Sequence, residues 1–389
     1  MSVDDMVIVG WDHSAIMLRK SQDIRSLDGM SSIEERVRSL IEDSGRSQRE
    51  FAVGVGLDAP KLSKSLSGAR RFSSLDLARI AEFTGETVDW LLTGERPIVA
   101  VAARAAAGSA TEVALREASA LVQIRDDLAE LGYRQHWQLP ERPLRSGRWD
   151  RDGELLAERA LAALASAGCT PWDPDLAGVV ESVFGVDVAV RPLGQQFDGL
   201  SVASDNCRLI LLAPADAPFR PRFTLAHELG HLIGADDQGI HVDEDIFRTG
   251  LVESEVRANA FAAAFLMPLA QVLALVGERP TRESFCRTAT QLRVSPSALA
   301  ARLEKARLID AGTKTSWSAI SAREAAHTAG DRTTLADAIS VANSIRPPGL
   351  LARAAFAAYE DGETTIRLYA RITGQDPEAL ARSLEASAP

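Results

Sequence analysis

The sequence Arg222-Phe-Thr-Leu-Ala-His-Glu-Leu-Gly-His-Leu-Ile-Gly234 decides the fold and the chemistry predicted for the second half of this chain. It contains the pattern His-Glu-x-x-His at His227, Glu228 and His231. In a helix, residues four apart share a face, so both imidazoles can reach one metal ion. Glu228 then lies beside a metal-bound water and can act as general base. The stretch therefore predicts a zinc site on a helix.

The residues around the two histidines have the spacing of a helix with one buried side. The apolar positions on that side are Phe223, Leu225, Ala226, Leu229, Leu232 and Ile233. Thr224 is expected to be the N-cap of this helix. A short pattern also occurs by chance, but two of the six histidines of the chain fall within this apolar stretch. Their position favours a metal site.

A catalytic zinc needs a third protein ligand and an open position for water. Glu255 is the favoured candidate, because it lies on a second predicted helix with an apolar face. Asp237, in the turn after the first helix, and Glu253 are the alternatives. Asn259 lies one turn after Glu255 and could hydrogen-bond the other ring nitrogen of a ligand histidine. His241 could polarise a substrate carbonyl, although an ordinary loop histidine is the simpler interpretation.

The pattern continues beyond the histidines as Glu255-x-x-Ala-Asn-x-Phe-Ala-Ala-x-Phe-Leu-Met-Pro268. Together with Phe184-Gly-Val-Asp-Val188 and Phe197-Asp-Gly-Leu-Ser201, it resembles the ImmA/IrrE family of zinc metallopeptidases. The resemblance covers about Ala157 to Asp310.

This resemblance implies a zincin-like metallopeptidase domain in which His227, His231 and Glu255 bind Zn2+ and Glu228 is catalytic. Members of the family cleave repressors of the Xre type, so a repressor-type protein is the implied substrate. Many members carry an acidic residue at the position of Ala264, and this chain lacks that carboxylate.

The composition is ordinary for a globular protein of two or three domains, with 46% hydrophobic and 25% charged residues in a chain of 389. No apolar run approaches the roughly 20 residues of a membrane span. The acidic start lacks the features of a secretory signal. Cys169, Cys207 and Cys286 are too far apart for a zinc finger or a disulfide framework. They predict free thiols in a cytoplasmic protein without membrane contact.

Residues 31–95 predict five short helices. The expected N-caps of the first four are Ser32, Ser47, Asp58 and Ser74. Val88-Asp-Trp-Leu-Leu92 forms the fifth.

This region resembles the Xre/Cro-type helix-turn-helix family. The resemblance rests on the run Ser47-Gln-x-x-x-Ala52, a glycine-bearing turn, Lys61-Leu-Ser63 and Ser67-Gly68. Such domains place the N-terminal residues of the second motif helix on base edges in the major groove. The candidate DNA contacts are Ala59, Lys61, Ser63 and Lys64 in the groove, Gln48 and Arg49 near the backbone, and Arg70 and Arg71 at phosphates. The net charge of −11 argues against binding through the whole surface, but Leu57–Phe72 carries four basic residues against one acidic. A helical bundle for protein contact is the alternative.

The predicted organisation has five parts. Residues 1–30 form an extension of unclear order, 31–95 the helix-turn-helix domain, 96–149 a helical connector and exposed linker, 150–310 the metallopeptidase domain and 311–389 a helical C-terminal region. Three short strands at Val186–Val190, Gly199–Ala203 and Leu209–Leu212 predict a small antiparallel sheet over the metal helix. An edge of this sheet could bind a substrate backbone by strand addition. The fold class is α+β and mostly α.

The leading functional interpretation is a cytoplasmic zinc endopeptidase joined to a domain that binds a double-stranded DNA operator. It would cleave a repressor-type protein, either a partner or its own chain. Operators for such domains usually have paired half-sites, which favours a homodimer. A transcription factor whose metal domain only senses a metal or ligand is a second interpretation. A component of a toxin–antitoxin or phage repressor system is a third.

Overall fold

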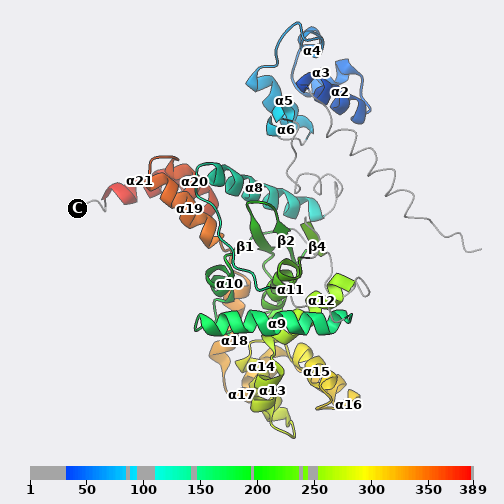
Figure 1. The fold of residues 1–389 in the computed structure, drawn as a ribbon, viewed down its shortest axis with the longest axis vertical. Helices are drawn as coiled ribbons and strands as arrows, with labels where there is room; N and C mark the ends of the chain where they lie inside the picture. The colour runs from blue at the N-terminus through cyan, green and yellow to red at the C-terminus, as the bar shows by residue number, and fades with distance from the viewer. Residues whose placement is uncertain are drawn as a thin grey trace, which may run out of the picture. The chain divides into compact units, whose positions relative to one another are not determined.

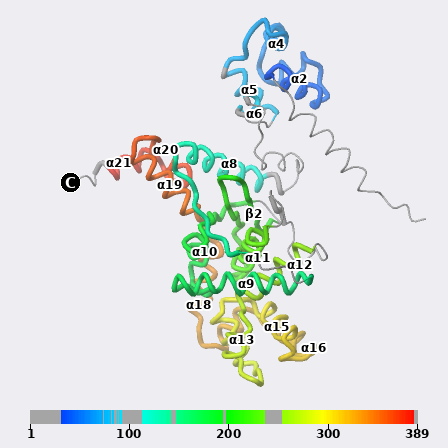
Figure 2. The backbone as a smooth tube through the Cα atoms, viewed as in Figure 1, coloured from blue at the N-terminus to red at the C-terminus, as the bar shows by residue number. Residues whose placement is uncertain are grey.

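The computed structural model describes residues 32–84, 88–93, 110–141, 147–193, 197–235, 240–243 and 253–386. The expected extension at residues 1–30 lies outside them. The chain divides into two compact units, Met1–Ala100 and Val101–Pro389. Figure 1 shows the helices of the first unit in blue and the second unit in cyan to red, and Figure 2 follows the backbone in the same view.

Five helices make up the described part of the first unit: α2 (Ile33–Asp43), α3 (Gln48–Gly54), α4 (Ala59–Leu66), α5 (Ser74–Thr84) and α6 (Val88–Thr93). All five expected helices are present. Their inward faces share one core, whose fully buried side chains include Val37, Phe51, Leu62, Ile80 and Leu91. Burying a side chain of this size stabilises a fold by about 1.5–3 kcal/mol. The apolar spacing of each short helix is therefore what assembles the unit.

The starts of these helices differ in detail from the expectation. Ser32 and Ser47 are the N-caps of α2 and α3, as the sequence predicts, and both form capping boxes. Asp58, before α4, makes no side-chain capping hydrogen bond. At α5 the cap is Ser73 instead of Ser74: the Ser73 N–H donates to the Asp76 carboxylate at 2.9 Å, and the Asp76 N–H donates to the Ser73 hydroxyl at 3.2 Å. The acidic residue three positions on makes Ser73 the better cap, because the two hydrogen bonds are reciprocal.

A four-stranded sheet lies at the centre of the second unit, in the order β1 (Asp187–Val190), β3 (Arg208–Leu212), β2 (Gly199–Ala203) and β4 (Ile240–Asp243). The three expected strands form, but β1 pairs parallel with β3, so the expected antiparallel sheet was wrong for that strand. β2 pairs antiparallel with β3 and with the unpredicted β4. Strands of four or five residues carry an alternation too short to specify direction or partner.

Helices pack on the sheet in layers. Helix α11 (Arg220–Gly234), which carries both histidines, packs against β2 and β3. In Figure 1 the sheet lies between α11 and α8 (Ala110–Glu130). Helix α12 (Glu253–Leu266) packs on α11, and α9 (Trp149–Ser166) packs closely on α12. A Cβ on Gly153 of α9 would lie 2.3 Å from the Arg257 carbonyl oxygen, so only glycine permits this approach.

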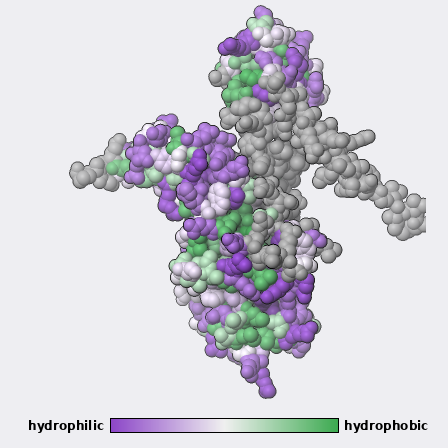
Figure 3. All heavy atoms as spheres, in the orientation of Figure 1, coloured by the Kyte–Doolittle hydropathy of each residue, from purple (hydrophilic) through white to green (hydrophobic). Residues whose placement is uncertain are grey.

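The remaining described helices are α10 (Leu176–Phe184), α13 (Leu269–Val276), α14 (Arg282–Gln291), α15 (Pro296–Lys305), α16 (Ala311–Ser318), α17 (Ala322–Ala329), α18 (Arg332–Ala342), α19 (Gly349–Glu360), α20 (Ile366–Thr373) and α21 (Pro377–Ala386). One hydrophobic core extends from Leu156 in α9 to Ala325 in α17. The lower part of the visible face in Figure 3 carries hydrophobic colouring, in the region where Figure 1 labels α13. Leu269 and Leu273 of this helix are exposed.

The helical part of the expected connector belongs to the second unit. Along α8 a continuous face is buried, formed by Ala114, Leu115, Ala118, Leu121, Val122 and Leu128. Arg125 on the same helix forms a buried ion pair with Asp187 at the start of β1. The predicted connector over 96–149 thus contains a helix, and that helix packs on the sheet.

The C-terminal helices also join this unit. Arg346 forms a backbone bridge with Val190, at the outer edge of β1. Its guanidinium pairs with the Glu181 carboxylate of α10 at 2.6 Å, and the Gly349 N–H donates to the same carboxylate at 2.6 Å. The Arg-Pro-Pro-Gly segment therefore covers the β1 edge of the sheet.

No described helix by itself has the length and hydropathy of a membrane span; α12 and α13 reach them only together, with a 45° bend between them. The three cysteines are free, as predicted. Cys207 and Cys286 are buried, and Cys169 is partly exposed.

Candidate metal centre

Helix α11 begins at Arg220, four residues before the expected N-cap Thr224. Pro221 lies in its first turn, where the missing N–H of proline leaves no helical hydrogen bond unmade. Thr224 lies inside the helix, and its hydroxyl donates to the Arg220 carbonyl oxygen at 3.2 Å. The expected cap was wrong, since proline marks the start of a helix more strongly than an isolated threonine. The additional turn places His227 well within the helix.

The two histidines lie side by side on α11. Their Nε2 atoms are 3.1 Å apart, and their ring centroids are 4.7 Å apart. His227 is fully buried and His231 is 2% exposed. The spacing of four residues therefore produces the convergence that a shared metal ion requires.

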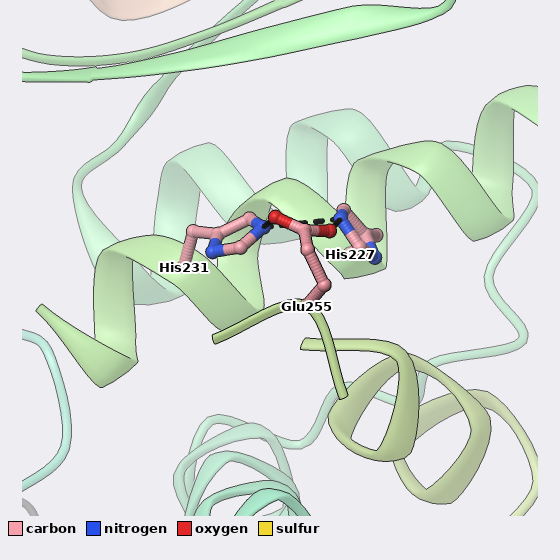
Figure 4. A group of neighbouring side chains, drawn as sticks. All are labelled: His227, His231 and Glu255. Atoms are coloured by element: carbon pink, nitrogen blue, oxygen red, sulfur yellow. Dashed lines mark hydrogen bonds and ion pairs between the residues drawn. The ribbon is translucent and has the colours of Figure 1, made fainter. Parts of the chain in front are cut away.

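Glu255, near the start of α12, completes a cluster with the two imidazoles (Figure 4). One carboxylate oxygen lies 3.2 Å from the His227 Nε2 atom, and the other lies 3.2 Å from the His231 Nε2 atom. One ligand atom from each of the three residues lies within 4.8 Å of the others. The structure thus brings together the three residues that the sequence favoured.

The other candidates do not join this cluster in the part of the chain that the structure describes. Glu253 is exposed in the first turn of α12. Asp237 lies outside the described residues, and so does the side chain of His241 in β4.

The electrostatics of Glu255 suit a metal ligand. Burial acts to raise the pKa of this carboxyl, but the hydrogen bonds with His227 and His231 outweigh burial. They hold the pKa of Glu255 well below the usual range of a glutamate. The carboxylate is therefore ionised over the whole neutral range, which is the form that binds a metal.

Glu228 is fully buried and follows His227 directly in α11. The cluster of three convergent donors does not include it. A glutamate at this position of a His-Glu-x-x-His helix is placed to activate water.

Gly230 sets the distance between the two helices and was not singled out from the sequence. A Cβ at this position would lie 3.0 Å from the Phe261 ring and 3.3 Å from the Cα atom of Ala258. Since both contacts are on α12, the glycine lets α12 approach until Glu255 reaches the histidines. A glycine between the two histidines, facing a second apolar helix, was the signal that could have identified it.

Arg222 holds the start of α11 in place and was also missed. The guanidinium donates to the carbonyl oxygens of Asp173 at 2.8 Å and Pro171 at 2.6 Å. Burial lowers the pKa of Arg222 to about 10, so it stays charged at neutral pH. A charged group buried against two carbonyls fixes the helix to the preceding loop.

Asn259 is the residue predicted to hydrogen-bond a ligand histidine. Among the described residues no hydrogen bond joins it to either histidine, and its side chain instead lines a large cavity. Ala264, where the resemblance led us to note a missing carboxylate, is buried in the core.

The candidate DNA contacts lie on the first unit. Gln48, Arg49, Lys61, Ser63, Lys64 and Arg71 are exposed, and Ala59 is partly exposed. Arg70 differs, because its guanidinium pairs with the Asp76 carboxylate at 2.7 Å and donates to the Ser65 hydroxyl at 3.0 Å. Arg70 therefore stabilises the junction of α4 and α5, whatever else it contacts.

The donor set fits zinc. Two imidazole nitrogens and one carboxylate oxygen form the ligand set of many catalytic zinc sites, with a fourth position left for water. Because the three donors already converge and the carboxylate is ionised, the residues need little movement to bind the ion.

Residues 181–304 match the model of the Peptidase_M78 family, described as the IrrE N-terminal-like domain. The chain is also 38% identical, over 133 residues, to the radiation response metalloprotease IrrE of Deinococcus radiodurans. That alignment covers 32% of this chain and 38% of the relative, so the similarity is confined to one region of each protein. It supports a metallopeptidase domain of the ImmA/IrrE type around the histidine and glutamate cluster.

Proposed function

We propose that this chain is a zinc-dependent endopeptidase that cleaves a repressor-type protein and that its first unit binds an operator in double-stranded DNA. The observation that carries the peptidase proposal is the convergence of His227, His231 and Glu255 beside the buried Glu228. The family match over the same residues supports it.

The proposed role of each side chain follows from its position. His227, His231 and Glu255 hold the zinc, which when bound lowers the pKa of water and polarises a carbonyl. Glu228 takes a proton from the attacking water at its carboxylate and delivers it to the leaving amine nitrogen.

The proposed substrate and DNA come from the two resemblances in the sequence. Proteins of the ImmA/IrrE type cut Xre-type repressors, and the first unit itself has the helix pattern of such a repressor. The exposed Lys61 and Lys64 of α4, with Arg71, provide the local positive charge that DNA binding needs. The proposed protein is a cytoplasmic homodimer on paired half-sites, which either cuts a partner repressor or its own chain.

Glu228→Gln tests the peptidase proposal. The amide keeps the shape of the side chain but cannot accept the proton, so the variant keeps zinc and loses about 10²–10⁴-fold in cleavage rate. Cleavage is measured by mass spectrometry on a pool of peptides from a bacterial proteome, and zinc by elemental analysis. Glu253→Gln is the matched control, because it removes an exposed carboxylate two residues from Glu255.

Equal fragment patterns in wild type and Glu228→Gln would reject proteolysis by this site. Reporter expression from the bound operator, measured in both strains, then distinguishes a regulator whose metal domain only senses, because that output survives the substitution.

A further inference from the structure

The last two helices of the chain repeat a pattern found in the first unit. Residues 365–384 align without a gap on residues 47–66, the stretch that resembles a helix-turn-helix. The helices begin at matching places, Gln48 and Ala59 for α3 and α4, and Ile366 and Pro377 for α20 and α21. The identical pairs are Arg49 and Arg367, Ala52 and Ala370, Gly56 and Gly374, Asp58 and Asp376, Leu62 and Leu380, Ser65 and Ser383, and Leu66 and Leu384.

The turn between the two helices has the same backbone geometry in both copies. Gly56 and Gly374 adopt the left-handed conformation, with φ of +66° and +70°. A glycine in this conformation ends a helix without steric strain, and in both copies an aspartate two positions later precedes the next helix. One hydrogen bond closes each turn. It runs from the N–H of Leu57 to the Ala52 carbonyl oxygen at 2.8 Å, and from the N–H of Gln375 to the Ala370 carbonyl oxygen at 3.0 Å.

Two other helix pairs of the second unit differ from this pattern. Helices α17 and α18 are also joined at a glycine, but the N-cap Asp331 follows it directly, so their turn is one residue shorter. Helices α14 and α15 have the longer turn, with Arg293 at φ 53° in place of the glycine. The basic residues of α15 are engaged within the unit, because Arg302 lies 3.2 Å and Lys305 3.4 Å from the Glu154 carboxylate. Only the C-terminal pair combines the pattern with unpaired basic side chains among the described helices of this unit.

The basic side chains of the C-terminal pair are available to an anionic partner. Arg367, Arg371 and Arg382 are exposed, and none forms an ion pair with another described residue. Arg367 takes the position of Arg49 in the first copy, and Arg382 takes that of Lys64. Each copy holds three basic residues against two acidic ones, in a chain whose net charge is −11. The local balance is thus the same where DNA contact is already proposed and at the C-terminal end.

The exposed face of α21 has the chemistry that reads base edges. Glu378, Ala379 and Arg382 are exposed, and Ala381 is partly exposed. In the major groove an arginine donates to guanine, a glutamate accepts from the cytosine amino group, and an alanine contacts the thymine methyl group. None of the exposed large hydrophobic side chains of the described residues lies in α20 or α21. This face therefore favours a nucleic acid over a protein partner.

The rest of the unit supports this helix pair. Helix α21 packs on α20, α20 packs on α19, and α19 packs on β1 and α8. Figure 1 shows the three helices together in orange and red, and the visible face of α19 and α20 is mostly hydrophilic in Figure 3.

We propose that α20 and α21 form a second helix-turn-helix that binds double-stranded DNA. Arg367 contacts the phosphate backbone, and Ala379, Ala381 and Arg382 enter the major groove. The proposal rests on the proposed DNA binding of the first unit, whose motif it repeats. With two motifs in one chain, loss of either leaves residual binding through the other.

Photochemical cross-linking tests the proposal without knowledge of the operator. The probe is a pool of duplexes of about 30 base pairs, roughly three turns of DNA, with a random central sequence and bromodeoxyuridine in place of thymidine. Bromine takes the place of the thymine methyl group in the major groove, so it reports the residues that approach that edge. After irradiation of the full chain and proteolysis, mass spectrometry should find cross-linked peptides from both α4 and α21.

Two arginine variants test the contacts by affinity. Arg367→Ala should reduce the slope of log affinity against log salt by about 1, as expected for one phosphate contact. Arg382→Ala should weaken binding of a duplex selected from the pool about fivefold or more, as expected for a base contact. Arg353→Ala on α19 is the matched control, because Arg353 is exposed and lies outside the motif. Fluorescence anisotropy measures binding, and thermal unfolding checks that the variants remain folded.

The outcomes separate this proposal from DNA binding by the first unit. Cross-links in α4 alone, or an affinity and salt slope that neither arginine variant changes, would overturn the second motif and leave the first unit's role intact. Cross-links in α21 alone, together with the arginine effects, support the second motif and reject DNA binding by α4. Cross-links in neither helix reject both.

Discussion

The two sets of candidate functional residues differ in how the fold holds them. His227, Glu228 and His231 are buried and Glu255 is partly buried, and donor atoms of the two histidines and Glu255 converge within 4.8 Å. The DNA candidates are mostly exposed, and Lys61 makes only a long ion pair with Asp58 at 3.8 Å. Burying polar side chains costs folding free energy unless they bind a partner or an ion, whereas a lysine in solvent carries no such cost. The burial of the metal residues therefore indicates a function, whereas the exposure of the DNA candidates does not.

The sharpest test of this difference is removal of a metal ligand. His227→Ala and His231→Ala each delete one of three donors, and we expect both to abolish zinc binding and peptide cleavage. Elemental analysis of the purified protein measures the zinc. Asp237→Ala and Glu253→Ala serve as controls that should keep it. Zinc retained in both histidine variants would contradict the site, and zinc lost from Asp237→Ala would move the third ligand to that residue.

Burial also distinguishes ion pairs within the second unit. Asp187→Ala removes the partner of Arg125, which is 1% exposed, and should destabilise the unit by about 3–5 kcal/mol. The exposed pair of Arg282 and Glu324 is the matched comparison, and Glu324→Ala should cost less than about 1 kcal/mol. Urea unfolding followed by circular dichroism measures both. Similar costs for the two variants would show that α8 is not held to the sheet as the structure places it.

The sequence predicted the metal cluster well because it depends on local rules. The i, i+4 spacing in α11 is fixed by helix geometry, and the apolar face of α12 indicated a second packed helix. The contribution of Gly230 was not predicted, since it depends on how closely α12 approaches, and that is a tertiary property. Asn259 lies on the predicted helix α12, but the cavity that its side chain lines also depends on tertiary packing.

The sequence predicted the helices and strands better than it predicted how they pair and pack. The helices with apolar repeats were expected and are present, although the expected caps Asp58, Ser74 and Thr224 do not cap them. The parallel pairing of β1 with β3 and the coverage of its edge by Arg346 were missed, because both join residues far apart in the sequence. The packing of α8 on the sheet was missed for the same reason, because its contacts join residues far apart in the sequence, such as Arg125 and Asp187.

For the exposed lysines of α4 we expect a moderate effect on DNA binding. Lys61→Ala and Lys64→Ala should each weaken operator binding by about 1–3 kcal/mol if these residues contact bases. Fluorescence anisotropy on the operator and on an unrelated duplex, at two salt concentrations, separates base contacts from phosphate contacts. Lys305→Ala, in the second unit, is the charge-matched control. Unchanged DNA binding in both variants of α4 would favour a helical bundle for protein contact.

The smallest expected effect on stability concerns Arg70. The sequence places Arg70 among the candidate DNA contacts, but its guanidinium pairs with a buried carboxylate. Its partner Asp76 is 5% exposed. Burial acts to raise the pKa of Asp76, but hydrogen bonds with Ser73 and Arg70 outweigh it, so the pKa of this carboxyl lies below its usual value. A carboxyl with a lowered pKa in the folded state stabilises the fold at neutral pH, and that contribution is lost as the pH falls below about 4.

Asp76→Asn should therefore destabilise the first unit by about 1 kcal/mol at pH 7 and make its stability less dependent on pH between about 5 and about 2. Hydrogen exchange of peptides from α5, in the full chain and corrected for the intrinsic pH dependence, measures the local stability. Asp58→Asn is the control, because its carboxylate is exposed in solvent, and its effect should stay within about 0.5 kcal/mol. If the two variants lose the same stability at neutral pH, Arg70 is not engaged by Asp76 and returns to the set of residues available for phosphate contacts. If only Asp76→Asn loses it, Arg70→Ala will weaken the fold as well as any DNA complex, and Arg71 becomes the arginine whose loss reports phosphate binding alone.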